Sequence, residues 1–323
     1  MRLIVFGAGA LGGLLGARLV PAGARVLMVG RPPTVEAIRA KGLIVEDSPP
    51  VAVHPEAIER LPDGAEADAL LLTIKSADLE GAADEIARAF PSGVPIVVLG
   101  NGLGIEERLA RRLAERGWHH AATFVVRAVT SLPSTWVAPG VVRPGGAGEI
   151  VLAGIEDRAI PPIAERLRLL LESGGIRVRV VADLPHEIWR KALVNAAINP
   201  VTADHGIANG AIVEDPWRGQ ALALLREARA VAHALGQDFA EDEIERDLWT
   251  VVRATAANRS SMLQDLDRGR PTEIDAISGE ILRLGRRHGL ALPATERVAR
   301  RIRERVERRR AAEGGVHDRA QAS

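Results

Sequence analysis

Lysine is scarce in this 323-residue chain. Lys41, Lys75 and Lys191 are its three lysines, against a combined total of 42 lysines and arginines. Arginine stays protonated in proteins, whereas burial can lower the pKa of a lysine until it donates a proton near neutral pH. A lysine kept at a motif position therefore indicates that an ammonium is needed there. Lys41 stands in a charged turn before Gly42, and we expect it to be an ordinary surface charge.

The segment that contains Lys191 spaces three polar residues evenly. Lys191, Asn195 and Asn199 stand four apart in residues 187–200, which are otherwise mostly apolar around the two asparagines. Positions four apart differ by about 40° around a helix and rise by about 6 Å, so all three side chains share one face. Burying them is costly unless they bind one another or a polar ligand. An exposed polar stripe is the alternative, but apolar residues flank Asn195 closely. Pro200 disfavours helical geometry at Asn199, where we expect a bend.

A second polar group stands in residues 258–265, after a helical pattern over 244–257. The next helix is expected to begin at Thr272, which with Asp275 fits a capping box. Glu273 would then lie in the first turn, where a carboxylate suits the helix dipole. From the spacing alone, a structural and a catalytic role for Glu273 both stay open.

A glycine pattern joins the first predicted strand to the first predicted helix. It consists of Gly7, Ala8, Gly9, Ala10, Leu11 and Gly12. Gly7 would turn tightly, Gly9 would let the backbone approach a pyrophosphate, and Gly12 would permit close helix packing. The start of a helix also attracts phosphate charge. Placed between a buried strand and a helix, the pattern predicts dinucleotide binding.

Arg31 follows the second predicted strand, 26–29, where the adenosine ribose should lie. An NAD enzyme usually has an acidic residue there, but this chain has Gly30 and Arg31. A carboxylate would repel a 2′-phosphate, whereas an arginine can clamp it. We therefore expect NADPH as the cofactor. The alternative is that Arg31 is one surface arginine among many.

Two further polar residues follow predicted strands. Lys75 ends the strand 71–75, and Asn101 follows the strand 95–99. Open α/β sheets bind ligands at the carboxyl ends of their strands. Asn101 with Gly102 could also be a simple turn.

Alternating strand and helix patterns fill the first half of the chain. Apolar runs at 3–6, 25–29, 69–74 and 95–99 lack polar alternation, as buried parallel strands do, and helical spacing at 79–90 and 105–116 separates them. The fold class is therefore α/β, with a doubly wound parallel sheet. Residues 121–153 are expected to extend this sheet in antiparallel fashion, before a helix at 158–173 and a strand at 176–181.

The second half of the chain is predicted to be almost entirely helical. We expect a dinucleotide-binding domain over 1–182, a helical domain over 183–312 that ends in the arginine-rich helix 295–310, and a disordered tail over 313–323, where polarity is high and periodicity is lost.

The composition excludes several classes of function. Net charge is zero and charges are interspersed, so neither nucleic acid nor an anionic membrane is an expected partner. Without cysteine there is no thiolate nucleophile, and without tyrosine there is no Tyr/Lys proton-donor pair. The eight histidines lack paired ligand spacing, so no metal site is expected. No apolar run would span a bilayer and no leader pattern follows Met1, so we expect a cytoplasmic protein with a small-molecule substrate.

The motifs together resemble a known family. GAGALG (7–12), LLTIK (71–75), NGLG (101–104), WRKALVNAAINPVTA (189–203) and NRSSMLQDLDRGRPTEID (258–275) are similar to motifs of the ketopantoate reductase (2-dehydropantoate 2-reductase) family of pantothenate and coenzyme A biosynthesis. The resemblance covers most of residues 1–310. It implies a Rossmann domain, a helical domain like that of 6-phosphogluconate dehydrogenase, and NADPH-dependent reduction of 2-dehydropantoate to pantoate.

The resemblance also implies roles for individual residues. Lys191 would be the general acid at the substrate's C2 carbonyl oxygen, and Glu273 would lie near that lysine and the cofactor. The substrate's carboxylate and hydroxyl would contact Asn195, Asn199, Asn209, Asn258 and Ser261, together with Lys191. NADPH would contact Gly7 to Gly12, Arg31, Lys75, Asn101 and Glu273.

One segment departs from the family pattern and leaves alternatives open. Residues 118–148 lack the expected glycine-led strand and the histidine before a glycine pair. The substrate could therefore be another branched or aromatic 2-oxo acid, as in the related D-mandelate dehydrogenases. A 2-hydroxy acid dehydrogenase with His186 or His205 as acid, or an NADPH-sensing protein without catalysis, are further alternatives. A homodimer is left open.

Overall fold

The computed structural model describes residues 1–153 and 162–321 and divides the chain into two compact units. The first unit comprises Met1–Gly100 and Gly104–Leu184. The second comprises Asn101–Leu103 and Pro185 onward. The boundary between Leu184 and Pro185 lies close to the predicted one, between residues 182 and 183. The short loop 101–103 therefore belongs to the second unit although it lies far from the rest of that unit in the sequence.

The main sheet of the first unit has six parallel strands in the order β5-β2-β1-β6-β7-β8. Its strands are β1 (Arg2–Phe6), β2 (Arg25–Val29), β5 (Glu56–Ile58), β6 (Ala69–Leu72), β7 (Ile96–Val98) and β8 (Val125–Arg127). Successive β1 side chains enter opposite cores: Leu3 and Val5 join one cluster, Ile4 and Phe6 the other. Burial on both faces explains the uninterrupted apolar runs in the sequence.

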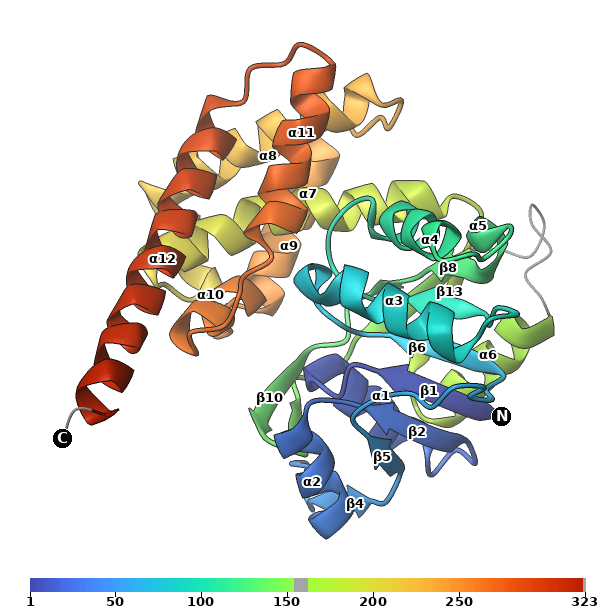
Figure 1. Ribbon diagram of the computed structural model, residues 1–323. Coiled ribbons are helices and arrows are strands. Elements are labelled where there is room, and N and C mark those ends of the chain that lie inside the picture. Colours follow the sequence, from blue (N-terminus) through green and yellow to red (C-terminus); the bar gives the residue numbers. More distant parts are fainter. Residues whose placement is uncertain (154–161, 322–323) are drawn as a thin grey trace. The chain divides into compact units, whose positions relative to one another are not determined.

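Helices cover both faces of this sheet. One core cluster contains α3 (Leu79–Ala89) and α4 (Ile105–Glu115), and the other contains α1 (Ala10–Leu19) and α2 (Pro32–Lys41). Figure 1 shows α3 and α4 beside β6 and β8. The short helix η1 (Ser76–Asp78) precedes α3. The predicted α/β fold class is confirmed.

Residues 121–153 differ from the predicted antiparallel extension of the main sheet. Ala121–Phe124 forms a helical turn, α5, and β8 then joins the main sheet in parallel. The remaining strands form two separate sheets, β10-β11-β3-β4 and β13-β12-β9. Their members are β3 (Leu43–Val45), β4 (Val51–Val53), β9 (Val129–Thr130), β10 (Ser134–Ala138), β11 (Val141–Pro144), β12 (Glu149–Ala153) and β13 (Arg177–Val181). Pro133 stands between β9 and β10 and has no N–H to donate to a ladder, which favours a break there.

The second unit is helical, and one long helix runs through its core. This helix is α7 (Leu184–His205), and Leu193, Ala197 and Val201 on it are fully buried. The other members are η2 (Asn209–Val213), α8 (Trp217–Ala234), α9 (Glu241–Ala254), α10 (Ser261–Asp267), η3 (Asp275–Gly279), α11 (Glu280–Arg287) and α12 (Pro293–Gln321), several of which are labelled in Figure 1.

The helix does not end at Asn199, although Pro200 disfavours helical geometry there. α7 continues through Pro200 to His205, and Thr202 Oγ1 donates to the carbonyl oxygen of Ile198 at 2.9 Å. Proline removes one helical hydrogen bond, but the apolar neighbours of this turn are buried in the unit's core, and their packing offsets the loss.

Two other boundaries differ from the sequence prediction. α12 continues to Gln321 and so includes most of 313–323, where a disordered tail was expected; no proline follows Pro293, although Gly314 and Gly315 have low helix propensity. The helix predicted at 158–173 is α6 (Pro162–Ser173), and residues 158–161 lie outside the described part. Within the described residues, none of the helices has the length and apolar character that a bilayer crossing requires.

Candidate active site

Three polar side chains of the second unit form a connected cluster. Lys191 Nζ donates a hydrogen bond to Asn101 Oδ1 at 2.8 Å. Asn101 Nδ2 donates in turn to Glu273 Oε2 at 3.1 Å. The asparagine amide thus joins an ammonium, which can only donate, to a carboxylate, which can only accept. We call these three residues the Lys191 cluster.

Lys191 and Glu273 are partly or fully buried, so leaving their charged groups without hydrogen bonds would be costly. Glu273 is 8% exposed, and Lys191 is half-buried on α7 between buried residues such as Ala192 and Leu193. An ionised group in such a place is stable only when it is paired and hydrogen-bonded. Asn101 serves both charged groups at once. The cluster therefore holds an ammonium whose position is fixed from one side by an amide oxygen.

The backbone of loop 101–103 explains how Asn101 reaches this position. Gly102 has a φ of +106°, and a Cβ there would lie 2.8 Å from the carbonyl oxygen of Ala276. The N–H of Leu103 donates to the same oxygen at 3.4 Å, and Leu103 is buried in the helical core. Ala276 stands in η3, near Glu273 in the chain. Only glycine permits this approach, so Gly102 brings the loop against the segment that carries Glu273.

The capping box expected at Thr272 and Asp275 is not formed. The carboxylate of Asp275 accepts from Arg303 of α12 at 2.6 and 2.9 Å, and the start of η3 has no side-chain cap. Glu273 precedes this helical turn and contributes its backbone carbonyl to Ile277 N–H. Its side chain is therefore committed to Asn101 rather than to a helix start.

A second polar cluster joins the end of α7 to the chain before α10. Thr202 Oγ1 lies 2.6 Å from Ser260 Oγ and 3.1 Å from the carbonyl oxygen of Asn199. Asn209 N–H donates to the carbonyl oxygen of Asn258 at 2.9 Å. Ser261 follows Ser260 in the chain. These bonds therefore link the segments that carry Asn199, Asn209, Asn258 and Ser261, for which the resemblance implies substrate contacts.

The members of this second cluster differ in exposure. Asn199 and Asn209 are buried, Asn195 is half-buried, and Asn258 and Ser261 are exposed. Asn209 Nδ2 donates to Thr255 Oγ1 at 2.9 Å, while its Oδ1 is buried without a hydrogen-bond partner among the described residues. A buried acceptor without a partner is unusual, and a donor such as a substrate hydroxyl would satisfy it.

Three residues of this cluster have no site role in the prediction from sequence, although Ser260 lies in the polar group 258–265. Thr202 and Thr255 each back-bond to a carbonyl one turn earlier in their helices, and Ser260 caps α10 by accepting from Leu263 N–H at 3.2 Å. The serine three residues before Leu263 was a signal for this cap. The contacts of the two threonines depend on residues distant in sequence and left no local signal.

The glycine loop of the first unit is built by close backbone approach. A Cβ on Gly12 would lie 2.0 Å from the carbonyl oxygen of Gly7 and 2.6 Å from Thr73 Oγ1. Thr73 Oγ1 itself donates to Gly7 O at 2.8 Å and so ties the loop to the end of β6. The turn therefore requires glycine at position 12, as the sequence pattern indicated.

The open side of this loop fits a phosphate group. A Cβ on Gly9 would meet no heavy atom within 4 Å, so the backbone is accessible there. α1 begins at Ala10 with no side-chain cap and no acidic residue in its first turn. Its first N–H groups are thus oriented for an anion, where the helix dipole also favours negative charge. These residues fit the pyrophosphate of a dinucleotide.

Arg31 and Lys75 stand at strand ends of the same unit. Arg31 precedes α2 in extended backbone, 78% of its side chain is exposed, and its Nη2 lies 3.4 Å from Asp78 Oδ2. Lys75 follows β6, which ends at Leu72 rather than at 75 as predicted, and it precedes η1. With Gly7 to Gly12, both belong to the first unit, whereas the Lys191 cluster belongs to the second.

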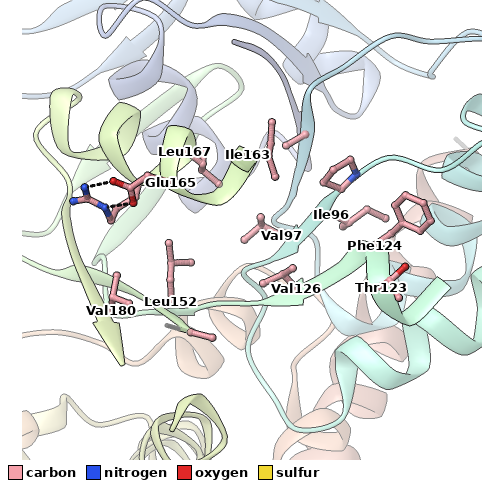
Figure 2. Close-up of a pocket in the computed structure, with 14 residues that line it drawn as sticks. Ile96, Val97, Thr123, Phe124, Val126, Leu152, Ile163, Glu165, Leu167 and Val180 are labelled. Carbon is pink, nitrogen blue, oxygen red and sulfur yellow. Dashed lines mark hydrogen bonds and ion pairs between the residues drawn. The ribbon is translucent and has the colours of Figure 1, made fainter. Parts of the chain in front are cut away.

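A small apolar pocket lies elsewhere in the first unit. Figure 2 shows Ile96, Phe124 and Val126 facing Leu152 and Ile163 across it, with the Glu165 carboxylate held in an ion pair. Ala69 and Ile96, the first residues of β6 and β7, line it, so it lies at the opposite strand ends from the glycine loop. Its volume of about 40 Å³ is too small for a dinucleotide. Within residues 1–153 and 162–321, no group of three His, Asp or Glu side chains could hold a metal ion.

Comparison with known proteins identifies relatives over nearly the whole chain. Residues 3–157 match the family model "Ketopantoate reductase PanE/ApbA", and residues 183–306 match its C-terminal domain. The chain is 35% identical to a 2-dehydropantoate 2-reductase of Archaeoglobus fulgidus over 90% of this chain and 92% of that protein. It is 31% identical to the enzyme of the same name from Halobacterium salinarum, over 94% and 98%.

Solved structures give the same result. The 2-dehydropantoate 2-reductase of Geobacter metallireducens GS-15 has a TM-score of 0.82 at 28% identity, over 94% of this chain and 99% of that one. A ternary structure of D-mandelate dehydrogenase with NADH and anilino(oxo)acetate has a TM-score of 0.87 at 21% identity, over 96% and 99%, which shows a shared fold alone. With both domain models matched and a relative 35% identical along its length, this chain belongs to the ketopantoate reductase family.

Proposed function

We propose that this chain catalyses the NADPH-dependent reduction of 2-dehydropantoate to pantoate, with Lys191 as the proton donor. The observation that carries the proposal is the Lys191 cluster, in which a half-buried ammonium donates to Asn101 and Asn101 donates to buried Glu273. Family membership supports the substrate, because the curated relatives are named 2-dehydropantoate 2-reductases.

Lys191 performs the acid step. Reduction of a ketone places negative charge on the carbonyl oxygen, and an ammonium beside that oxygen both stabilises the charge and supplies the proton. Asn101 occupies one of the three donor hydrogens of Nζ. This contact fixes the direction of the remaining hydrogens, so the proton is delivered from a set position rather than from a freely rotating chain.

Glu273 supports this step through Asn101. Its carboxylate accepts from Asn101 Nδ2 and so holds the amide with its oxygen towards Lys191. The same negative charge favours the protonated form of a nearby lysine. Glu273 thereby keeps the donor charged and aligned before reaction.

The second polar cluster recognises the substrate. Asn195 and Asn199 extend the Lys191 face of α7, and Asn209, Asn258 and Ser261 are gathered near its end. The unpaired Oδ1 of Asn209 accepts a substrate hydroxyl, and the amide N–H groups of the other asparagines donate to the carboxylate. Two polar ends of a small 2-oxo acid are thus bound on one helical unit.

The first unit binds the cofactor, as the Rossmann domain of the proposed enzyme, and the second carries the substrate and the acid. Gly7 to Gly12 and the start of α1 hold the pyrophosphate, Arg31 holds the 2′-phosphate, and Lys75 contacts the remainder; contact of Asn101 with NADPH stays a prediction. When bound, the reduced nicotinamide supplies the hydride that Lys191 cannot. In keeping with this function, we place the protein in the cytoplasm; a homodimer stays a prediction that light scattering would test.

A steady-state assay tests the proposal. Initial rates are measured for ketopantoate and a panel of 2-oxo acids that includes phenylglyoxylate, each with NADPH and NADH. The proposal predicts the highest kcat/KM with ketopantoate and NADPH. A strong preference for phenylglyoxylate would show a mandelate dehydrogenase-like specificity instead, and tight NADPH binding without turnover of any 2-oxo acid would indicate a sensor.

A further inference from the structure

Arg127 is a buried arginine that the roles above do not use. It ends β8, and only 8% of it is exposed. Moving a guanidinium out of water is costly, so a buried arginine is stable only where hydrogen bonds or an ion pair offset that cost. Its Nη2 donates to the backbone carbonyl oxygen of Gly100 at 2.6 Å, and its Nε lies 3.9 Å from Glu106 Oε2.

Glu106 is a poor source of stability for this arginine. It lies in the first turn of α4, and burial raises the pKa of its carboxyl while the charge of Arg127 opposes that rise. Glu106 Oε2 is buried and has no hydrogen-bond partner among the described residues. At 3.9 Å the pair is an ion pair without a hydrogen bond. The short bond to Gly100 is the better-formed interaction.

Gly100 is the residue directly before Asn101. Its carbonyl oxygen and the N–H of Asn101 belong to one planar peptide unit. Fixing that oxygen therefore fixes the direction in which the chain enters loop 101–103. On the other side of Asn101, Gly102 and Leu103 are held against Ala276. Gly102 and Leu103 hold the chain on the C-terminal side of Asn101. Arg127 holds it on the N-terminal side, through Gly100.

We infer that Arg127, with Glu106 as its counter-ion, is a positioning residue for the Lys191 cluster. It sets the orientation of the Gly100–Asn101 peptide, through it the position of the Asn101 amide, and so the place from which Lys191 Nζ donates. Arg127 does not touch the substrate in this account. The expected loss of kcat rests on the proposed function. The expected displacement of Asn101 and Lys191 does not depend on it.

The kinetic test compares Arg127→Met and Arg127→Lys with the wild type. A misplaced donor lowers kcat about 10- to 100-fold, while KM for NADPH changes much less than kcat because the glycine loop, Arg31 and Lys75 are unaffected. Arg127→Lys retains a charged donor and should recover part of kcat. The matched control is Arg112→Met, which removes a two-point ion pair between α4 and Asp84 without touching Gly100.

A spectroscopic test needs no turnover, and the three lysines of the chain make it simple. The protein is labelled with ¹³C and ¹⁵N at lysine, and its side-chain NMR signals are recorded. The signals that disappear in Lys191→Arg are those of Lys191. We expect them, and their pH titration, to shift in Arg127→Met and less in Arg127→Lys, while exposed Lys41 stays unchanged. If Arg127→Met does not fold, Arg127→Lys and Glu106→Gln supply the same comparison.

The outcomes separate this inference from the proposed function. A folded Arg127→Met protein with wild-type Lys191 signals would overturn the positioning role, whatever the substrate is. Equal shifts in Arg112→Met would overturn it too, because they would reflect a general loosening of the first unit. A wild type that reduces no 2-oxo acid would refute the proposed function, and the lysine signals would still decide the role of Arg127.

Discussion

The glycine loop of the first unit and the Lys191 cluster of the second are built in opposite ways. The loop is made of backbone: Gly7, Gly9 and Gly12 stand within six residues, and the site is formed by what their missing side chains permit. The Lys191 cluster is made of side chains from three distant segments: Lys191 stands 90 positions after Asn101 in the chain, and Glu273 stands 172 positions after it.

Because of this difference, the two regions should tolerate different kinds of substitution. A backbone site is destroyed by adding atoms, because a new Cβ collides with the chain or with the ligand. A side-chain site is destroyed by removing atoms, because each group holds the next. Substitutions that add or delete single groups should therefore have different signatures in the two units.

The largest expected effect comes from deletion at Lys191. Lys191→Ala should lower kcat by about 10²- to 10⁴-fold, because the proton donor is lost. Lys191→Arg should fail nearly as badly, since arginine keeps the charge but does not release a proton at this pH. NADPH affinity, measured by fluorescence titration, should stay close to that of the wild type. Arg190→Ala is the control on the same helix; its ion pair with Asp247 does not include Asn101, and a comparable loss of kcat there would contradict a specific role for Lys191.

Addition in the glycine loop should show the reverse signature. Gly12→Ala places a Cβ 2.0 Å from Gly7 O and should destabilise the protein by about 1–3 kcal/mol while weakening NADPH binding. Gly9→Ala meets no protein atom and should change stability by less than about 1 kcal/mol. It should still weaken NADPH binding, because the new methyl occupies the space of the phosphate. Urea unfolding and NADPH titration of both variants measure this, and normal binding by Gly9→Ala would exclude a phosphate at that position.

Arg31 differs from the glycine loop because it is expected to contact the same cofactor through its side chain. Arg31→Ala should raise KM for NADPH by about 10-fold or more through loss of a charge-assisted contact, with little change in KM for NADH. Lys41→Ala, at the other end of α2, is the control. Equal effects on both cofactors would show that Arg31 does not bind the 2′-phosphate.

The smallest expected effect concerns pH and is confined to the first unit. Arg116 and Arg112 lower the pKa of Asp84 from 3.8 to about 2. Because the folded pKa lies below the unfolded one, the contribution of Asp84 is present above pH 3.8 and is lost as pH falls through about 2. Wild type and Asp84→Asn should therefore differ in urea midpoint at pH 6 and converge near pH 2. A difference that persists at pH 2 would show that the carboxylate contributes through something other than its charge.

The two regions also differ in how far the sequence predicts them. The α/β fold, its parallel strands and the close packing at Gly12 follow from local patterns, and the structure confirms them. Asn101 was predicted to lie on the cofactor side because it follows a strand. In the structure its amide also joins Lys191 to Glu273, a contact that the sequence did not predict, since loop 101–103 is held by Ala276 of the helical unit. Such a contact has no local signature.

Two other residues show the same limit. The capping box at Thr272 and Asp275 fits every local rule, yet Asp275 pairs with Arg303, which lies on a helix that the motif does not include. Arg127 stands in a segment whose sequence indicated only irregular strands, and a buried arginine leaves no periodic trace. The structure was needed wherever a polar group finds its partner far along the chain.

A double-mutant cycle on kcat with ketopantoate and NADPH tests whether Asn101 and Lys191 act as one unit. The variants are Asn101→Ala, Lys191→Ala and the double substitution, and each is first shown to bind NADPH. We predict that the double variant is no slower than Lys191→Ala, because Asn101 has nothing left to position once the lysine is gone. If the two losses multiply instead, the residues act independently and the account of the Lys191 cluster is wrong.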